Sequence, residues 1–158
     1  MTVQESDFNS IVTKSLNSQG GFGFKIPDER STLTGFHSKN PYDIFGIFEN
    51  NFVAWESKWM NKPQSFNFER LEKHQIDNLI KAFELIDNCM SVFAVGIDFG
   101  RADKRIFIWK NEDLYEILKR KNDKKNILKK EFEQRTNYVK ISGGQINMTD
   151  VLNLSSVK

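Results

Sequence analysis

The sequence has little cysteine and histidine, with one cysteine, Cys89, and two histidines in 158 residues. A single cysteine excludes an internal disulfide framework, and two histidines make a zinc site an unexpected feature. No apolar run approaches the roughly 20 residues that a membrane-spanning helix needs. Residues 1–8 carry acids and no apolar stretch. We therefore expect a soluble, cytoplasmic protein that does not act at a membrane.

A strong charge of either sign is also missing, because the formal net charge is only +2. Such a weak balance does not by itself indicate a nucleic-acid partner, so that case depends on local clusters of basic residues. Apolar residues make up 39% of the chain and aromatic residues 13%, enough to bury a core at this length. Without an internal repeat or a long linker, we expect one domain over residues 1–158, with a basic, flexible segment at 119–130 and a tail at 143–158 that ends frayed.

Helical and strand patterns alternate along the chain. Helical spacing of apolar residues predicts helices over 4–17 and 67–88, and a third that opens at 111–113 and continues through 118. Strand patterns cover 22–26, 44–48, 52–55, 92–97 and 105–109. The nearly continuous apolar run at 92–97 suits a central strand that is covered on both faces. We expect an α/β fold in which helices flank a central mixed β-sheet.

Two acids stand beside the strands of a predicted hairpin. Asp43 directly precedes the strand at 44–48, and Glu56, thirteen positions later (56 − 43), continues the strand that begins at 52. The residues Glu49-Asn50-Asn51 supply turn chemistry between the two strands. The hairpin therefore brings Asp43 and Glu56 close together.

The side-chain period of a strand places Glu56 and Lys58 on one face and Trp55 and Trp59 on the other. Paired carboxylates suit a hard divalent ion such as Mg²⁺, and a neighbouring ammonium can orient an attacking water or a phosphate. The alternative is a surface acid and an edge-strand acid in an ion pair with Lys58. Trp55 and Trp59 are either core residues or subunit contacts.

These residues and their order resemble the PD-(D/E)XK nuclease superfamily, and within it the RecU-type Holliday-junction resolvases. The likeness rests on Pro41-Tyr42-Asp43, on Glu56-Ser57-Lys58, and on the segment from Leu71 to Ile76, which looks like the His-Gln helix of RecU proteins. It covers residues 36–115 and is weaker at both ends. The resemblance implies a restriction-endonuclease-like fold and a metal-dependent endonuclease that cuts branched DNA.

The resemblance also implies roles for individual residues. The metal ligands would be Asp43, Glu56, the backbone carbonyl of Ser57, and Glu5. They would hold one or two Mg²⁺ ions, for which Mn²⁺ would substitute. Lys58 would position the water, with support from Gln75. Taken alone, Glu5 also suits a helix N-terminus, where the macrodipole favours acids, and Gln75 is otherwise an ordinary polar helix residue.

By the same resemblance, the enzyme would be a homodimer that cuts two opposed strands of a four-way junction and needs no nucleotide cofactor. Basic residues near the expected site are candidate DNA contacts, because the segment 119–130 has seven basic residues and one acid. Such a run is otherwise a solvated face. Ser38 and Lys39, just before Asp43, would either touch a phosphate or form a polar loop. The candidate contacts are Ser38, Lys39, Lys62, Lys124, Lys125, Lys129 and Lys130.

Two other functions fit the same motifs. One is a restriction or repair nuclease of the same superfamily. The other is a non-catalytic, DNA-binding recombination accessory protein that keeps the fold but has lost the reaction. The presence of Asp43, Glu56 and Lys58 together argues against such a loss.

Overall fold

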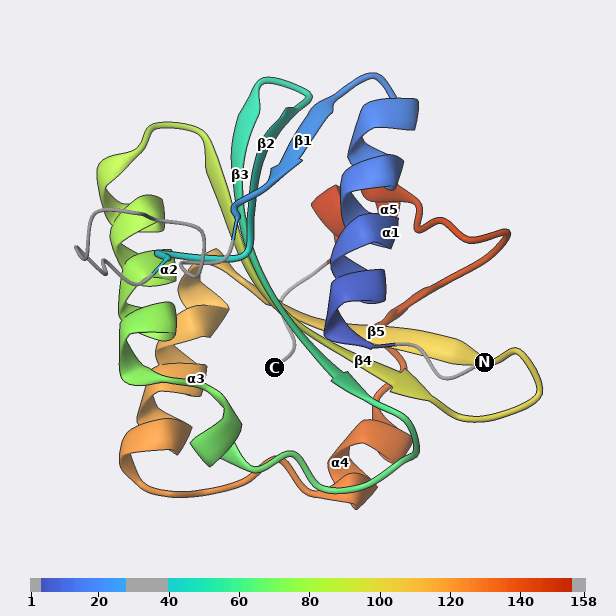
Figure 1. Ribbon diagram of the computed structural model, residues 1–158. Helices are drawn as coiled ribbons and strands as arrows, with labels where there is room; N and C mark the ends of the chain where they lie inside the picture. Colours follow the sequence, from blue (N-terminus) through green and yellow to red (C-terminus); the bar gives the residue numbers. More distant parts are fainter. Residues whose placement is uncertain (1–3, 28–39, 155–158) are drawn as a thin grey trace.

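A mixed six-stranded sheet forms the centre of the computed structural model, which describes residues 4–27 and 40–154 (Figure 1). The strand order follows the sequence, β1-β2-β3-β4-β5-β6. The strands are β1 (Phe22–Lys25), β2 (Ile44–Phe48), β3 (Asn51–Met60), β4 (Cys89–Asp98), β5 (Lys104–Lys110) and β6 (Val139–Lys140). Only β3 and β4 run parallel, and the other neighbours are antiparallel. The mixed sheet and the hairpin predicted from the sequence are confirmed.

Helices cover both faces of this sheet (Figure 1). They are α1 (Glu5–Ser18), α2 (Lys73–Leu85), α3 (Leu114–Asn122), α4 (Lys129–Gln134) and α5 (Met148–Asn153). The α1 and α5 side chains pack into one core, whereas those of α2, α3 and α4 pack into a second core on the opposite face. Because β3 and β4 are parallel, their connection must cross over the sheet, and α2 is that crossover. None of the helices in the described ranges is long and apolar enough to cross a membrane.

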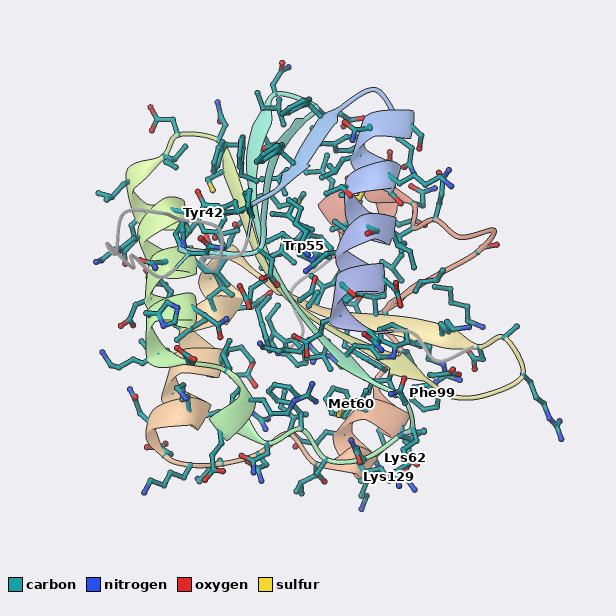
Figure 2. All side chains as sticks on the ribbon, in the orientation of Figure 1. Tyr42, Trp55, Met60, Lys62, Phe99 and Lys129 are labelled. Carbon is teal, nitrogen blue, oxygen red and sulfur yellow. The ribbon has the colours of Figure 1, made fainter. Side chains whose placement is uncertain are left out.

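Alternation along β3 distributes its side chains between the two cores. Trp55 is fully buried and Trp59 is 5% exposed, both in the core beneath α1. Trp59 lies flat over β4 because position 96 is glycine, where a Cβ would approach the Trp59 ring to 2.3 Å. The interpretation of these tryptophans as subunit contacts is therefore wrong, since both belong to the core of their own chain. Figure 2 shows Trp55 between the sheet and α1.

Two glycines face each other across β1 and β2, and the one on β1 lets α1 lie close to the sheet. Gly23 pairs with Gly46. A Cβ at Gly46 would lie 2.2 Å from the Phe22 carbonyl oxygen, and one at Gly23 would lie 2.8 Å from Leu16 of α1. Only glycine permits this approach. The contact at Gly23 packs α1 against β1, which pairs with β2, and β2 begins directly after Asp43.

The helix predicted over 67–88 is shorter than expected and interrupted. Phe68–Arg70 forms a separate 3-10 turn, and α2 begins at Lys73. Leu71 lies between them in an extended conformation, with φ −108° and ψ 111°. Glu72 and Gln75 form a capping box that starts α2, since each side chain accepts a hydrogen bond from the other's backbone. Leu71 is buried although it is not helical, so the helical spacing of apolar residues continues across the break.

The tail at 143–158 packs against α1 as far as residue 154. Met148 and Val151 of α5 are fully buried. The Gln19 side chain ties this segment to the end of α1, because it donates to the Ile146 carbonyl at 2.7 Å and accepts from the Met148 N–H at 2.8 Å. Gly143 and Gly144 have positive φ and make a turn, so they do not end the ordered chain. Residues 155–158 lie outside the described residues.

Candidate active site

The site forms where β3 extends beyond its neighbour β2. The last backbone pair joins Ile44 to Trp55, and the Asp43 N–H donates to the Trp55 carbonyl at 3.0 Å. One step further, the Asp43 carboxylate accepts a hydrogen bond from the Ser57 N–H at 3.0 Å. The Asp43 side chain thus pairs with the β3 backbone at a position where β2 no longer does. Because the N–H and C=O of a strand residue point to the same side, the Ser57 carbonyl also faces this open edge beside Asp43.

Glu56 lies next to Asp43 on the α2 side of β3 and is 1% exposed. One carboxylate oxygen, Oε1, accepts a hydrogen bond from Gln75 Nε2 at 2.7 Å and lies 3.7 Å from Lys58 Nζ. The other oxygen, Oε2, is buried and has no hydrogen-bond partner within the described part of the chain. A buried acceptor without a partner destabilises a fold unless something satisfies it. A cation at Oε2 would do so.

Lys58 connects this acid to the first helix. It is 8% exposed, and its Nζ lies 3.5 Å from Glu5 Oε1. The other Glu5 oxygen lies 3.0 Å from Arg70 Nη2, which also donates to the Trp59 carbonyl at 3.0 Å. Arg70 therefore covers the open edge of β3 one residue pair beyond Ser57 and holds the N-terminus of α1 against it. No sequence pattern signals this role, because it depends on the short 3-10 turn that carries Arg70.

Burial controls the charge of the two acids. It raises the pKa of the Asp43 carboxyl, while the Ser57 N–H, the Lys58 ammonium and a hydrogen bond from Asn9 lower it. Burial also raises the pKa of Glu56 well above its usual value, Asp43 adds to this rise, and Lys58 opposes it. Two carboxylates that repel each other in a desolvated position favour protonation until a cation compensates their charge. The electrostatics of the site therefore fit a cation.

The available donors are oxygen atoms, which suit a hard divalent ion. They come from Asp43, Glu56 and the Ser57 carbonyl. Within residues 4–27 and 40–154, no three His, Cys, Asp or Glu side chains converge closely enough to hold a metal by themselves. Glu5 is instead paired with Lys58 and Arg70. The residues fit a metal that two carboxylates and one carbonyl bind, with water completing its coordination.

Gln75, which was expected to support Lys58, contacts Glu56. Its Nε2 donates to Glu56, and its Oε1 accepts from the Glu72 N–H at 2.9 Å. The capping box at the start of α2 thus holds Gln75 in the orientation in which it fixes Glu56. Asn9 of α1 also reaches Asp43, and the sequence did not identify it.

The predicted DNA contacts lie apart from the acids, toward the end at which β3 finishes. Lys62 follows β3, and Figure 2 shows it beside Lys129 at the start of α4. The Lys129 N–H donates to Ser65 Oγ at 3.0 Å, which joins these two segments. Lys124 borders a cavity of about 290 Å³ against residues 67–69. Lys125 and Lys130 are exposed, and Ser38 and Lys39 lie outside the described residues.

The segment 119–130 is the end of α3, a turn, and the start of α4. Not all of its charge is free, because Arg120 pairs with Glu131 at 2.6 Å and with Glu116 at 3.1 Å. Lys121 donates to the Phe68 carbonyl at 2.9 Å. Lys129 Nζ at the start of α4 also lies 3.5 Å from Glu133 Oε1, and the exposed lysines around the turn add further positive charge.

The mixed sheet, with Asp43 directly before β2 and with Glu56 and Lys58 on β3, has the arrangement expected from the resemblance to PD-(D/E)XK nucleases. The chain belongs to the RecU family, since the model of that family, described as Recombination protein U, matches residues 13–154. The match extends beyond the region 36–115 that carries the resemblance, but it does not include Glu5 or Asn9. No curated protein matches the chain.

Among solved structures, the chain is similar to Hjc of Archaeoglobus fulgidus, described as a Holliday junction resolvase from an archaeal hyperthermophile. The two chains are 17% identical, and the similarity covers 65% of this chain and 84% of Hjc, with a TM-score of 0.36.

Proposed function

We propose that the protein is a Mg²⁺-dependent endonuclease that resolves four-way DNA junctions by paired phosphodiester hydrolysis in recombination and repair. Its membership of the RecU family supports the substrate class. The observation that carries the chemistry is the acid pair at the open edge of β3, in which Glu56 is buried and its Oε2 has no partner among the described residues.

In the proposed mechanism, Asp43, Glu56 and the Ser57 carbonyl hold the metal. When bound, a divalent ion activates water and stabilises the charge that develops on the phosphate. Mn²⁺ would substitute for Mg²⁺, because both accept oxygen ligands. The Asp43 carboxylate is fixed by the Ser57 N–H at 3.0 Å, and Glu56 is fixed by Gln75 at 2.7 Å. These contacts hold the ligands before the metal arrives, which lowers the reorganisation needed for catalysis.

Lys58 is the proposed group that positions the attacking water. Its ammonium lies between Glu56 and Glu5, at 3.7 and 3.5 Å, and is nearly buried. An ammonium held at this depth can donate to a water or to a phosphate oxygen beside the metal. One Glu5 oxygen is paired with Lys58 and the other with Arg70, so its role as a metal ligand remains a prediction.

The exposed lysines at the far end of β3 are proposed to bind the DNA backbone. They are Lys62, Lys124, Lys125, Lys129 and Lys130. Lysines that contact phosphates add affinity without sequence preference and make binding depend on salt. Ser38 and Lys39, which precede the catalytic hairpin, are proposed as further contacts.

Cleavage of defined substrates tests the proposed function. Purified protein is incubated with Mg²⁺ and labelled four-way junction, duplex, flap or single strand. We expect paired cuts in the junction with 5′-phosphate ends, and no product with EDTA or with Glu56→Gln. Equal cleavage of duplex and junction would instead indicate a restriction or repair nuclease. Junction binding without cleavage in any divalent metal would indicate an accessory protein.

A further inference from the structure

Asn9 is a buried polar residue that faces the acids from the first helix. It is 4% exposed and lies one helical turn after Glu5, on the same face of α1. Its neighbour Phe8 packs against Trp59, with ring centroids 5.5 Å apart, which fixes the rotation of the helix. Asn9 therefore has a defined position near Asp43, which directly precedes β2.

The two polar atoms of the Asn9 amide differ in their hydrogen bonding. A hydrogen bond from its side chain favours the ionised form of Asp43. Its carbonyl oxygen, Oδ1, is buried and has no hydrogen-bond partner in the ranges that the structure describes. An amide oxygen has two lone pairs, so leaving it desolvated and unpaired is unfavourable. This position is therefore not explained by folding alone.

Two of the unpaired buried atoms belong to residues that interact with Asp43. Three buried side-chain nitrogen or oxygen atoms in residues 4–27 and 40–154 have no partner, namely Asn9 Oδ1, Glu56 Oε2 and Arg135 Nε. The first two belong to residues that interact with Asp43, since Asn9 gives it a hydrogen bond and the charge of Asp43 raises the pKa of Glu56. Both are oxygens, so a cation with its water shell would satisfy both.

Asn17 of the same helix shows how a structural asparagine differs. Its Nδ2 donates to the Gly23 carbonyl at 3.2 Å, and its Oδ1 accepts from the Gly23 N–H at 3.0 Å. Both ends of this amide are satisfied within the chain. Asn17 thus joins α1 to β1 without any ligand, whereas Asn9 keeps an acceptor free beside the acids.

We propose that Asn9 is a positioning residue of the metal site, whose Nδ2 holds Asp43 and whose Oδ1 accepts a hydrogen bond from a water bound to the divalent ion. This inference rests on the proposed function, because it assumes that Asp43 and Glu56 bind that ion. Groups that orient metal ligands and their waters from outside the coordination shell change metal affinity by about 10- to 100-fold when they are removed. The proposal therefore predicts an effect on metal binding itself, before any DNA is present.

The test is a titration of the DNA-free protein with Mn²⁺, in which electron paramagnetic resonance measures the free ion. Asn9→Leu keeps the approximate volume and removes both hydrogen-bonding ends, so we expect Mn²⁺ to bind at least about tenfold more weakly. Asn9→Asp keeps an acceptor oxygen and adds negative charge, so it should bind Mn²⁺ at least as well as wild type. Asn17→Leu is the matched control, which should lower the unfolding temperature and leave Mn²⁺ affinity unchanged.

Two results would overturn the inference. One is wild-type Mn²⁺ affinity in Asn9→Leu, and the other is an Asn9→Asp protein that binds as weakly as Asn9→Leu. If Asn9→Leu does not fold, Asn9→Asp decides by comparison with wild type, and Mn²⁺ binding at least about tenfold weaker than wild type would overturn the inference. Glu56→Gln separates this failure from that of the proposed function. If wild type binds Mn²⁺ no better than Glu56→Gln, the proposed metal site itself is wrong.

Discussion

At the scale of single residues, the site is a group of buried charges that the fold holds together against their mutual repulsion. Glu56 is 1% exposed, and the negative charge of Asp43 adds to the effect of burial on its pKa. Lys58 and the Gln75 amide compensate only part of this charge. The charge of Glu56 therefore opposes folding in the absence of a cation, while the same carboxylate is the proposed metal ligand.

The first prediction concerns the separation of chemistry from binding. Glu56→Gln and Asp43→Asn each remove a ligand charge and keep the shape of the side chain, so junction cleavage should fall at least about a hundredfold. Junction affinity should be unchanged or higher, since the acids repel phosphate. Cleavage rates and binding are measured on the same labelled junction. Glu49→Gln, at the exposed turn of the same hairpin, should cleave like wild type, and cleavage at wild-type rates in both ligand variants would exclude this site.

A second prediction follows from the raised pKa of Glu56. In the metal-free protein, the unfolded chain loses the Glu56 proton first, near the ordinary value of 4.5, and the folded chain loses it at higher pH. Protonated Glu56 therefore contributes stability to the folded chain that is fully present below pH 4.5. This contribution is lost as pH rises through the raised pKa that Glu56 has in the folded chain. Glu56→Gln cannot ionise and should not show this loss.

Thermal unfolding in EDTA at pH 5 and at pH 8 measures the effect. Glu56→Gln should unfold at a higher temperature than wild type at pH 8, by roughly 2–4 °C for each kcal/mol of relieved repulsion and desolvation. The difference between the two proteins should shrink at pH 5. An equal unfolding temperature at pH 8 would mean that Glu56 is not desolvated in solution.

At the scale of elements, sequence patterns predicted what is local and missed what is tertiary. Alternation along one strand is enough to place Glu56 and Lys58 on the same face, and turn residues are enough to pair β2 with β3. No local pattern reveals that Arg70 reaches the open edge of β3 from a 3-10 turn. Asn9 is likewise one polar residue among several on an amphipathic helix, and only packing turns it toward Asp43. Sequence patterns missed the helix break at Leu71, because Leu71 is buried in an extended conformation at a position that fits the apolar spacing of a helix.

The third prediction concerns the basic elements around the end of α3 and the start of α4. Replacing four exposed lysines with alanine should weaken binding to every DNA structure and keep the preference for junctions. These lysines are Lys124, Lys125, Lys129 and Lys130. The slope of log affinity against log salt should flatten by roughly 0.9 for each phosphate that a lysine no longer neutralises.

A second set of four exposed lysines provides a control with the same change in net charge. It consists of Lys14, Lys25, Lys73 and Lys81. If general attraction to DNA were responsible, both quadruple variants would show the same decrease in affinity and in salt dependence. An unchanged slope in the first variant would mean that the basic turn is a solvated face.

At the scale of the whole molecule, one chain offers one acid pair, whereas resolving a junction requires two cuts. A four-way junction is nearly twofold symmetric, so a twofold dimer would present two identical sites to two equivalent strands. The structure removes Trp55 and Trp59 from any such interface, because both lie in the core beneath α1. Dimerisation thus remains a proposal that rests on the symmetry of the substrate.

The last prediction tests this assembly through mixed subunits. We expect the protein to sediment as a dimer at micromolar concentration without DNA. An excess of Glu56→Gln would place most wild-type subunits in dimers with one inactive site, so paired incisions in a cruciform plasmid should become single nicks. An equal excess of Glu49→Gln should leave linear plasmid as the product. If the protein is monomeric both free and on the junction, or if the first mixture still yields linear plasmid in proportion to active protein, each chain cuts alone and the function is that of a simpler nuclease.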